Sequence, residues 1–310
     1  MGERARIARF FAPLAAEEAG SFFLTDDAAV VMPPSGQQLV ITTDSVFEGI
    51  HVLRGATPQQ FAQKLVRRNL SDLAAMGATP WRYTLNVHTP HNLSDAWFAA
   101  FATALAQEQT TFGLVLIGGD STSGGDVIHL TMTCFGLLSG LPLRRNGAML
   151  GDTVYVSGNL GGAAYALSLL QHKQPVEAAL ATRYHCPEPR LGLGTALSGV
   201  ASSAIDISDG LVADAGQICV ASSVGMRIES SALPLQAGLD ARALLFALSG
   251  GDDYELCFTA PANQHSVIEK LSMSLGIAIT RIGVIVAGDG VHVIDANGAP
   301  LTLAQGGYEH

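Results

Sequence analysis

The sequence has 310 residues, of which 17 are Lys or Arg and 27 are Asp or Glu, giving a formal net charge of −10. This acidic balance argues against a nucleic-acid partner, because binding a phosphate backbone needs clustered Lys and Arg, and against an anionic membrane surface. With 48% hydrophobic and 14% charged residues, the chain can form a hydrophobic core, and its length suits two ordinary domains.

Strand-like and helix-like patterns alternate along the first part of the chain. The β-branched run at 39–43 predicts a strand that ends at Asp44. Thr57 and Pro58 predict the start of a helix, because Thr is a favoured N-cap and Pro a favoured first helical residue. Two further strands are expected at 113–117, running into Gly118-Gly119-Asp120, and at 127–138.

A segment rich in turn residues, 139–147, marks a domain junction. We therefore expect an N-terminal domain at residues 1-138 and a C-terminal domain at residues 139-310. Beyond the junction, strands are expected at 153–156, 204–207, 226–229, 254–259, 279–286 and 291–295, and helices at 163–171, 210–222 and 263–275. This alternation predicts an α/β fold.

The four cysteines are scattered, without a CxxC pair or a His at ligand spacing. They predict reduced core thiols in a cytoplasmic protein, not a disulfide framework or a zinc site.

The 16 Asp residues outnumber the 11 Glu, and nine of the Asp fall in six short segments. The segments hold Asp26-Asp27, Asp44, Asp72, Asp120, Asp206 with Asp209, and Asp252-Asp253. Most of them end or begin strands, and strand ends in α/β proteins carry functional side chains on short loops. Taken singly, each is also explained as a turn residue or a cap; Asp209, directly before Gly210, is an adequate N-cap.

Asp72 falls on the helix that begins at Pro58. At about 100° per residue, Phe61, Leu65, Leu73 and Met76 form one apolar arc, and Asp72 lies inside it. A carboxylate on the buried side of a helix is costly unless it is paired or bound to a metal. Asp72 is therefore either satisfied by a cap or by an arginine such as Arg67 or Arg68, or it is a metal ligand.

Several carboxylates in one pocket need a compensating charge, which hard divalent cations, Mg²⁺ above all, supply. Mg²⁺ beside glycine-rich strand ends suggests nucleotide phosphates. The sequence has no GxxxxGKS/T motif, no Lys in a glycine-rich loop, and no HRD or DFG segment, which excludes P-loop and protein-kinase folds. Phosphate charge would be handled mainly by metals, helped by Arg144 or Arg145.

Six segments carry a resemblance to a known family. They are Asp26-Asp27-Ala-Ala-Val, Thr42-Thr43-Asp44 with Glu48-Gly-Ile-His51, Asn69-Leu-Ser-Asp-Leu-Ala-Ala-Met-Gly77, Gly118-Gly-Asp-Ser-Thr122, Ile205-Asp-Ile-Ser-Asp-Gly210 and Ser249-Gly-Gly-Asp-Asp-Tyr-Glu255. In this order they resemble thiamine-monophosphate kinases, over nearly the whole chain. Single pieces are shared with aminoimidazole-ribonucleotide synthetases, selenophosphate synthetases and hydrogenase-maturation proteins.

The resemblance implies an α/β (α+β) fold with two domains, like that of aminoimidazole-ribonucleotide synthetases. The domain at 1-138 would bind ATP and Mg²⁺ and pair its sheet across a homodimer. The domain at 139-310 would be an α/β sandwich that closes the nucleotide and substrate cleft.

The resemblance also implies ATP-dependent phosphorylation of thiamine monophosphate to thiamine diphosphate, with several Mg²⁺ ions and stimulation by K⁺. When the motifs are matched residue by residue, the resemblance implies these metal ligands: Asp27, Thr42 or Thr43, Asp44, Asp72, Asp120, Asp206 and Asp209. The implied nucleotide contacts are Gly119, Asp120, Arg145 and Ser208. The implied substrate contacts are His51, Asp252 and Tyr308. Asp120 and Asp209 would be catalytic. By composition alone, His51 would be an ordinary loop histidine.

The sequence departs from the family pattern at three places. Asp252 stands where the family usually has Glu, Thr25 where Gly is usual, and Ser123 where Arg is common. Two other functions remain as alternatives: ATP-dependent activation of another small substrate, and non-catalytic regulation through a bound Mg-nucleotide. The carboxylate set, complete by motif matching, counts against the second.

Overall fold

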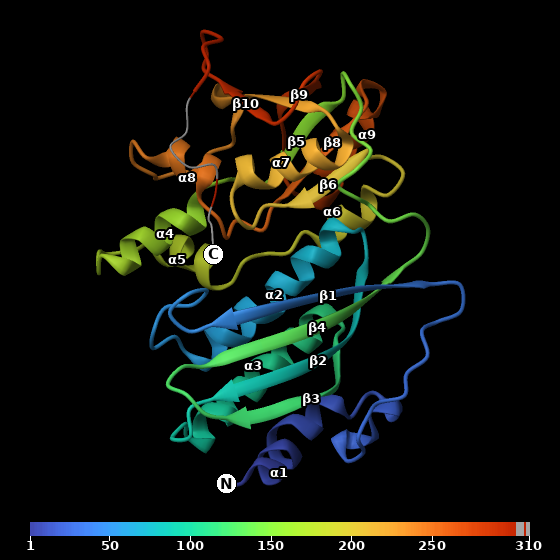
Figure 1. The fold of residues 1–310 in the computed structure, drawn as a ribbon, viewed down its shortest axis with the longest axis vertical. Helices are drawn as coiled ribbons and strands as arrows, with labels where there is room; N and C mark the ends of the chain where they lie inside the picture. Colours follow the sequence, from blue (N-terminus) through green and yellow to red (C-terminus); the bar gives the residue numbers. More distant parts are fainter. Residues whose placement is uncertain (302–306, 308–310) are drawn as a thin grey trace. The chain divides into compact units, whose positions relative to one another are not determined.

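The computed structural model describes residues 1–301 and Gly307. The chain divides into two compact units (Figure 1): Met1–Leu73 with Ala78–Ser139, and Ala74–Gly77 with Gly140–His310. Each unit has one sheet with both parallel and antiparallel neighbours, together with helices. The α/β class expected from the sequence is confirmed. No helix in the described ranges is long and apolar enough to span a membrane.

The first unit contains a four-stranded sheet in the order β1-β4-β2-β3. The strands are β1 (Gln38–Phe47), β2 (Thr79–Thr89), β3 (Val115–Ser123) and β4 (His129–Leu138). Strand β4 is antiparallel to β1 and β2, and β3 is parallel to β2. Residues of β4 alternate between half-buried and buried, as expected for a sheet with one covered face. Strands β1 and β3 form the two edges.

Two long helices cover one face of this sheet (Figure 1). The helices of the unit are α1 (Glu3–Arg6), η1 (Ile7–Phe11), η2 (Ala12–Ala15), η3 (Ala19–Leu24), α2 (Pro58–Ala75) and α3 (Asp95–Phe112). Helix α2 begins at Pro58, as predicted. Thr57 Oγ1 accepts the N–H of Gln60 at 3.2 Å and Gln60 Oε1 accepts the N–H of Thr57 at 2.9 Å, a reciprocal cap that satisfies free backbone donors.

In the first unit, two predicted strand ends are wrong, and one strand and one long helix were not predicted; in the second unit, the helices Ala178–His185, Leu191–Ala196 and Ala243–Ser249 were not predicted. Strand β1 continues through Asp44 to Phe47, and β3 continues through Asp120 to Ser123. Both strands keep full-length hydrogen-bonding partners, since Phe47 pairs with His129 and Ser123 with Thr89, and a sheet with one solvated face tolerates polar residues inside a strand. Strand β2 and helix α3 were missing from the sequence interpretation.

The second unit contains a six-stranded sheet in the order β10-β7-β9-β5-β8-β6. The strands are β5 (Thr153–Ser157), β6 (Ser203–Asp206), β7 (Gly225–Glu229), β8 (Leu256–Ala260), β9 (Ile279–Val286) and β10 (Val291–Ile294). The helices are α4 (Gly162–Gln171), α5 (Ala178–His185), α6 (Leu191–Ala196), α7 (Leu211–Ser222), η4 (Ser230–Ala232), α8 (Ala243–Ser249), η5 (Ala262–Gln264) and α9 (His265–Leu275).

Both faces of the six-stranded sheet are buried. On β5, Val154 and Val156 belong to one apolar cluster, together with residues of α7 and α8. Tyr155, between them, belongs to a second cluster with residues of α6 and α9. Because successive side chains of a strand point to opposite faces, helices cover this sheet on both sides. The loops at the ends of its strands are therefore held on a rigid base.

Candidate active site

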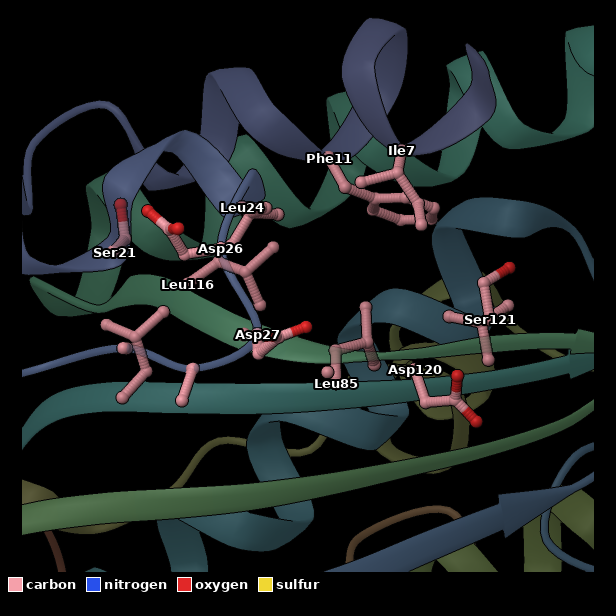
Figure 2. Close-up of a pocket in the computed structure, with 16 residues that line it drawn as sticks. Ile7, Phe11, Ser21, Leu24, Asp26, Asp27, Leu85, Leu116, Asp120 and Ser121 are labelled. Atoms are coloured by element: carbon pink, nitrogen blue, oxygen red, sulfur yellow. The ribbon is translucent and has the colours of Figure 1, made fainter. Parts of the chain in front are cut away.

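A pocket of about 110 Å³ in the first unit is lined by three carboxylates and by apolar side chains (Figure 2). Asp26 and Asp27 follow η3, and Asp120 comes from β3. The apolar wall includes Ile7 and Phe11 from the N-terminal helices. Among the residues that the structure describes, these three carboxylates form no ion pair. Unpaired carboxylates gathered at a partly apolar pocket are suited to bind a cation.

Gly119 lines the same pocket, and the sheet itself requires a glycine there. Its φ is +153°, and a Cβ atom would lie 1.8 Å from the carbonyl oxygen of Leu85 on β2. Any side chain would push β3 away from β2, next to the register shift between Tyr83 and Thr84. The glycine before Asp120 thus has a structural cause, besides the nucleotide contact that the resemblance implies.

A second carboxylate group lies where β1 meets α2. Thr42 Oγ1 donates to Asp72 Oδ2 at 2.5 Å, and Arg68 forms a two-point ion pair with Asp44, at 3.1 and 3.2 Å. Thr42 and Asp44 are two positions apart, so both side chains leave β1 on the same face. Thr43 leaves on the opposite face, where its hydroxyl meets that of Thr133 at 2.9 Å.

The two carboxylate groups of the first unit lie at opposite edges of the sheet. Asp44 is on β1 and Asp120 on β3, with β4 and β2 between them. Three strand spacings separate these edges by roughly 14 Å. The structure therefore brings Asp27 to Asp120, and Asp44 to Asp72, but it does not bring the two pairs together within one chain.

His51 lies in a tight turn after β1. Its Nδ1 accepts the N–H of Phe47 at 3.0 Å, so the neutral ring carries its proton on Nε2. Glu48 steadies the same loop by accepting the N–H of Gly55 at 3.1 Å and the N–H of Ile128 at 3.3 Å. The histidine is thus fixed in orientation by a backbone contact.

In the second unit, the loop between β6 and α7 carries Asp206, Ser208 and Asp209. Asp206 is 6% exposed at the end of β6. The N-cap of α7 is Gly210, with φ +129°, and not Asp209 as the sequence suggested. Instead, the carboxylate of Asp214 accepts the N–H groups of Ser208, Asp209 and Gly210 at 2.9, 3.0 and 3.1 Å. Burial raises the pKa of Asp214 to about 6, against the lowering effect of the backbone hydrogen bonds.

Asp252 lies directly beside this loop. Its N–H donates to the carbonyl of Ser208 at 2.8 Å, and the N–H of Tyr254 donates to the carbonyl of Ile207 at 2.8 Å. These bonds extend the pairing of β6 with β8. Gly251 permits the approach, since a Cβ atom there would lie 2.3 Å from the oxygen of Ser208. A predicted substrate residue and a predicted nucleotide residue thus share one hydrogen-bonded pair of loops.

The structure gives less information about two other predicted residues, Arg145 and Tyr308. Arg145 has an exposed side chain in the segment before β5, and its carbonyl accepts the hydroxyl of Ser222 at 3.2 Å. Tyr308 lies outside the described residues.

The donor atoms on these elements suit Mg²⁺. Carboxylate and hydroxyl oxygens are the hard ligands that Mg²⁺ prefers, and it is commonly bound through one or two carboxylates plus phosphate oxygens and water. Within the described ranges, no three His, Cys, Asp or Glu side chains are close enough to hold a metal by themselves. The chemistry therefore fits Mg²⁺ that is bound together with phosphates.

Comparison with known proteins relates both units to one family. Residues 25–138 match the model of the AIR synthase related protein, N-terminal domain, and residues 150–296 match that of the C-terminal domain. The thiamine-monophosphate kinase of Escherichia coli (strain K12) is 38% identical over 322 residues, covering 100% of this chain and 98% of its own length. The chain belongs to the thiamine-monophosphate kinase family.

Solved structures of thiamine-monophosphate kinases agree with this assignment. The enzyme from Stenotrophomonas maltophilia K279a has a TM-score of 0.81 and 40% identity, covering 87% of this chain and 89% of its own. The structure of AaThiL complexed with AMPPCP and TMP has a TM-score of 0.79 and 29% identity, covering 95% and 98%. The AIR-synthase-like two-domain fold implied by the resemblance is confirmed.

The sequence interpretation missed one carboxylate that holds a loop of the second unit, Asp214, and gave no role to another, Asp253, which it grouped only with Asp252. Asp214 holds the β6–α7 loop, and Asp253, 5% exposed, accepts the N–H of Gly161 at 2.7 Å. A signal for Asp214 existed, since an acid four residues after Gly210 falls in the first turn of a helix, where it stabilises free N–H groups. Asp253 gave no such signal, because its partner lies 92 residues away.

Proposed function

We propose that this chain transfers the γ-phosphoryl group of ATP directly to the phosphate of thiamine monophosphate, forming thiamine diphosphate. Membership of the thiamine-monophosphate kinase family over the full length supports this reaction. The observation in the structure that carries the proposal is the pocket lined by Asp26, Asp27 and Asp120, which have no ion-pair partner among the described residues. The 38% identity to a kinase counts against activation of a different small substrate.

Mg²⁺ is part of the proposal. When bound, Mg²⁺ would supply positive charge that offsets the negative charge on the phosphates during transfer. The residues that would hold it are Asp27, Thr42, Thr43, Asp44, Asp72, Asp120, Asp206 and Asp209. For Thr43 only the backbone oxygen would serve alongside Thr42 and Asp44, because its side chain lies on the other face of β1. Stimulation by K⁺ remains part of the proposal on the resemblance alone.

Each of the two substrates would be bound by its own set of residues. Gly119, Arg145 and Ser208 would contact the nucleotide, and Arg145 is free to turn because its side chain is exposed. His51, Asp252 and Tyr308 would contact thiamine monophosphate. Because the acceptor is already an anionic phosphate, the reaction needs no strong general base, and alignment and charge neutralisation account for catalysis.

We further propose that a homodimer completes the site. The Asp27–Asp120 pair and the Asp44–Asp72 pair lie at opposite edges of the sheet, so pairing β3 of one protomer with β1 of its partner would bring the two pairs together. Edge strand β1 also carries Leu39 and Ile41, which are 42% and 58% exposed, and exposed apolar edges are normally covered.

The roles of the two parts of the chain follow as proposals. Residues 1-138 would supply ATP and Mg²⁺ binding and the dimer contact, and residues 139-310 would close the nucleotide and substrate cleft. A cytoplasmic location is also proposed, and the four cysteines, none of which forms a disulfide in the structure, are consistent with it.

The reaction is tested by separating the products formed from ATP, Mg²⁺ and thiamine monophosphate. We expect thiamine diphosphate from the wild type and at least a 100-fold lower kcat from Asp120→Asn, because loss of one charge-stabilising group typically costs ~10²–10³ in rate. The control is Asp126→Asn, an exposed Asp in the turn that follows β3, which should leave the rate unchanged.

The outcomes separate the alternatives. No thiamine diphosphate from the wild type would overturn the kinase proposal, and tight nucleotide binding without product would favour a regulator. Near-normal turnover by the Asp120→Asn variant would remove Asp120 from the site.

A further inference from the structure

Three consecutive backbone N–H groups in the β6–α7 loop converge on one oxygen atom. Oδ2 of Asp214 accepts from Ser208, Asp209 and Gly210 at 2.9, 3.0 and 3.1 Å. Asp214 is in the first turn of α7 and is 6% exposed. Successive N–H groups aimed at one point form an anion-binding concavity of the kind that often holds phosphate.

In this chain a side chain of the protein itself, the carboxylate of Asp214, occupies the concavity. Because Asp214 occupies the three donors, they are not available to a nucleotide phosphate. The contribution of the loop to the site then comes from the side chains of Asp206, Ser208 and Asp209. This explains in physical terms how the loop can carry carboxylates toward cations and still have its backbone donors satisfied.

The hydrogen bonds of Asp214 also affect the loop that carries Asp252. The carbonyl of Ser208 accepts the N–H of Asp252 at 2.8 Å, so a change in the position of Ser208 also moves Asp252. Gly210 adds to the constraint: its φ is +129°, and a Cβ atom there would lie 3.0 Å from the backbone of Ser249. The loop has little room to relax if its internal acceptor is lost.

We propose that Asp214 is a positioning residue for phosphoryl transfer, which fixes Ser208 and Asp209 through its three backbone hydrogen bonds. The inference rests on the proposed function of Ser208 and Asp209. It assigns to Asp214 no contact with substrate or metal. What matters is an acceptor oxygen in the right place, and not the negative charge as such.

The test compares three variants of Asp214. Asp214→Asn keeps an acceptor oxygen in place and should retain kcat within about 10-fold, because amide oxygens accept the same hydrogen bonds. Asp214→Ala removes the acceptor, and Asp214→Glu keeps the charge but displaces it by one methylene. Both should lower kcat more than 100-fold, raise the Mg²⁺ concentration that gives half-maximal rate, and speed amide hydrogen exchange at Ser208, Asp209 and Gly210.

The matched control is Asp152→Ala. Asp152 is also buried, at 4% exposure, and accepts a backbone N–H from Met149 and a hydroxyl from Ser202. Its loss should lower the midpoint of unfolding while the kcat and Mg²⁺ dependence of the folded enzyme stay near those of the wild type.

The inference would be overturned by an Asp214→Glu variant with the wild-type kcat, Mg²⁺ dependence and amide exchange. This comparison tests the inference even if the Asp214→Ala variant does not fold. An Asp214→Asn variant as inactive as Asp214→Glu would also contradict it. Failure of the wild type and of Asp152→Ala to form product would instead count against the proposed function, and the amide exchange rates would still decide whether Asp214 holds the loop.

Discussion

At the scale of single residues, Asp252 is held in an unusual backbone conformation. Its φ is +68° and that of Tyr254 is +50°, a region that non-glycine residues seldom occupy and that Asp tolerates better than most. The hydroxyl of Tyr254 donates to Asp252 Oδ1 at 3.0 Å. Backbone strain of this kind is concentrated at functional sites, so the conformation supports a binding role for Asp252.

Replacing Asp252 with Glu tests the departure from the family pattern. We expect Asp252→Glu to lower the KM for thiamine monophosphate by roughly 3- to 10-fold, because a longer acid reaches further and a typical hydrogen bond contributes about 0.5–1.5 kcal/mol net. The KM for ATP should not change. Steady-state kinetics with each substrate varied in turn measures both, with exposed Asp289→Glu as the control. An unchanged KM for thiamine monophosphate would show that the shorter acid serves equally well.

At the scale of elements, a buried carboxylate ties helix α4 to the loop before β8. Asp253 Oδ2 accepts the N–H of Gly161, the N-cap of α4, at 2.7 Å. Burial, helped by the nearby Glu255, raises the pKa of Asp253 to about 7, against the lowering effects of the Gly161 hydrogen bond and of Arg183. In the unfolded chain its pKa returns to about 3.9.

This pKa difference makes stability fall as the pH rises. Between about pH 4 and pH 7 the folded state holds a proton on Asp253 that the unfolded state has lost, so the free energy of unfolding decreases with pH across this window and levels off above it. We expect Asp253→Asn to remove about 2–3 kcal/mol of this decrease between pH 5 and pH 8. Urea unfolding of both proteins at the two pH values measures it, with exposed Asp289→Asn as the control. An equal difference between wild type and variant at both pH values would contradict the assignment.

At the scale of the whole molecule, the order β1-β4-β2-β3 decides where the carboxylates lie. Asp120 and Asp44 belong to opposite edges, roughly 14 Å apart within one chain. In the proposed two-fold dimer, β3 of each protomer would lie beside β1 of its partner. Under the proposed pairing, each active site would take one carboxylate pair from each protomer.

Mixing inactive variants tests this arrangement. Asp120→Asn and Asp72→Asn should each be inactive alone, and mixing under conditions that exchange subunits should restore up to about a quarter of the wild-type rate, because half the dimers then contain one intact site. Asp120→Asn mixed with Asp27→Asn should restore nothing, since both changes affect the same pair. Light scattering should give twice the 32.2 kDa chain mass. A monomer mass, or no recovery on mixing, would contradict the shared site.

Local patterns predicted the parts of the fold that local interactions control. The cap of α2 depends on Thr57 and Gln60, three residues apart, and β9 has the predicted bounds, Ile279–Val286. The ends of β1 and β3 were wrong because a strand ends where its partner strand stops pairing, and the partners lie far along the sequence. The site residues that the motifs indicate remain predictions, and the structure adds where each of them lies.

The sequence by itself determined the kind of chemistry. Clustered Asp beside Gly, very few Lys and six ordered motifs indicate oxygen ligands, Mg²⁺ and the kinase family, because residue type and spacing are local properties. Only the tertiary structure decided which carboxylates lie near one another, namely Asp27 near Asp120 and Asp44 near Asp72. It also decided that Asp214 accepts hydrogen bonds from the backbone of Ser208 and Asp209. The physical reason is that sheet order and backbone hydrogen bonds between distant segments set these positions.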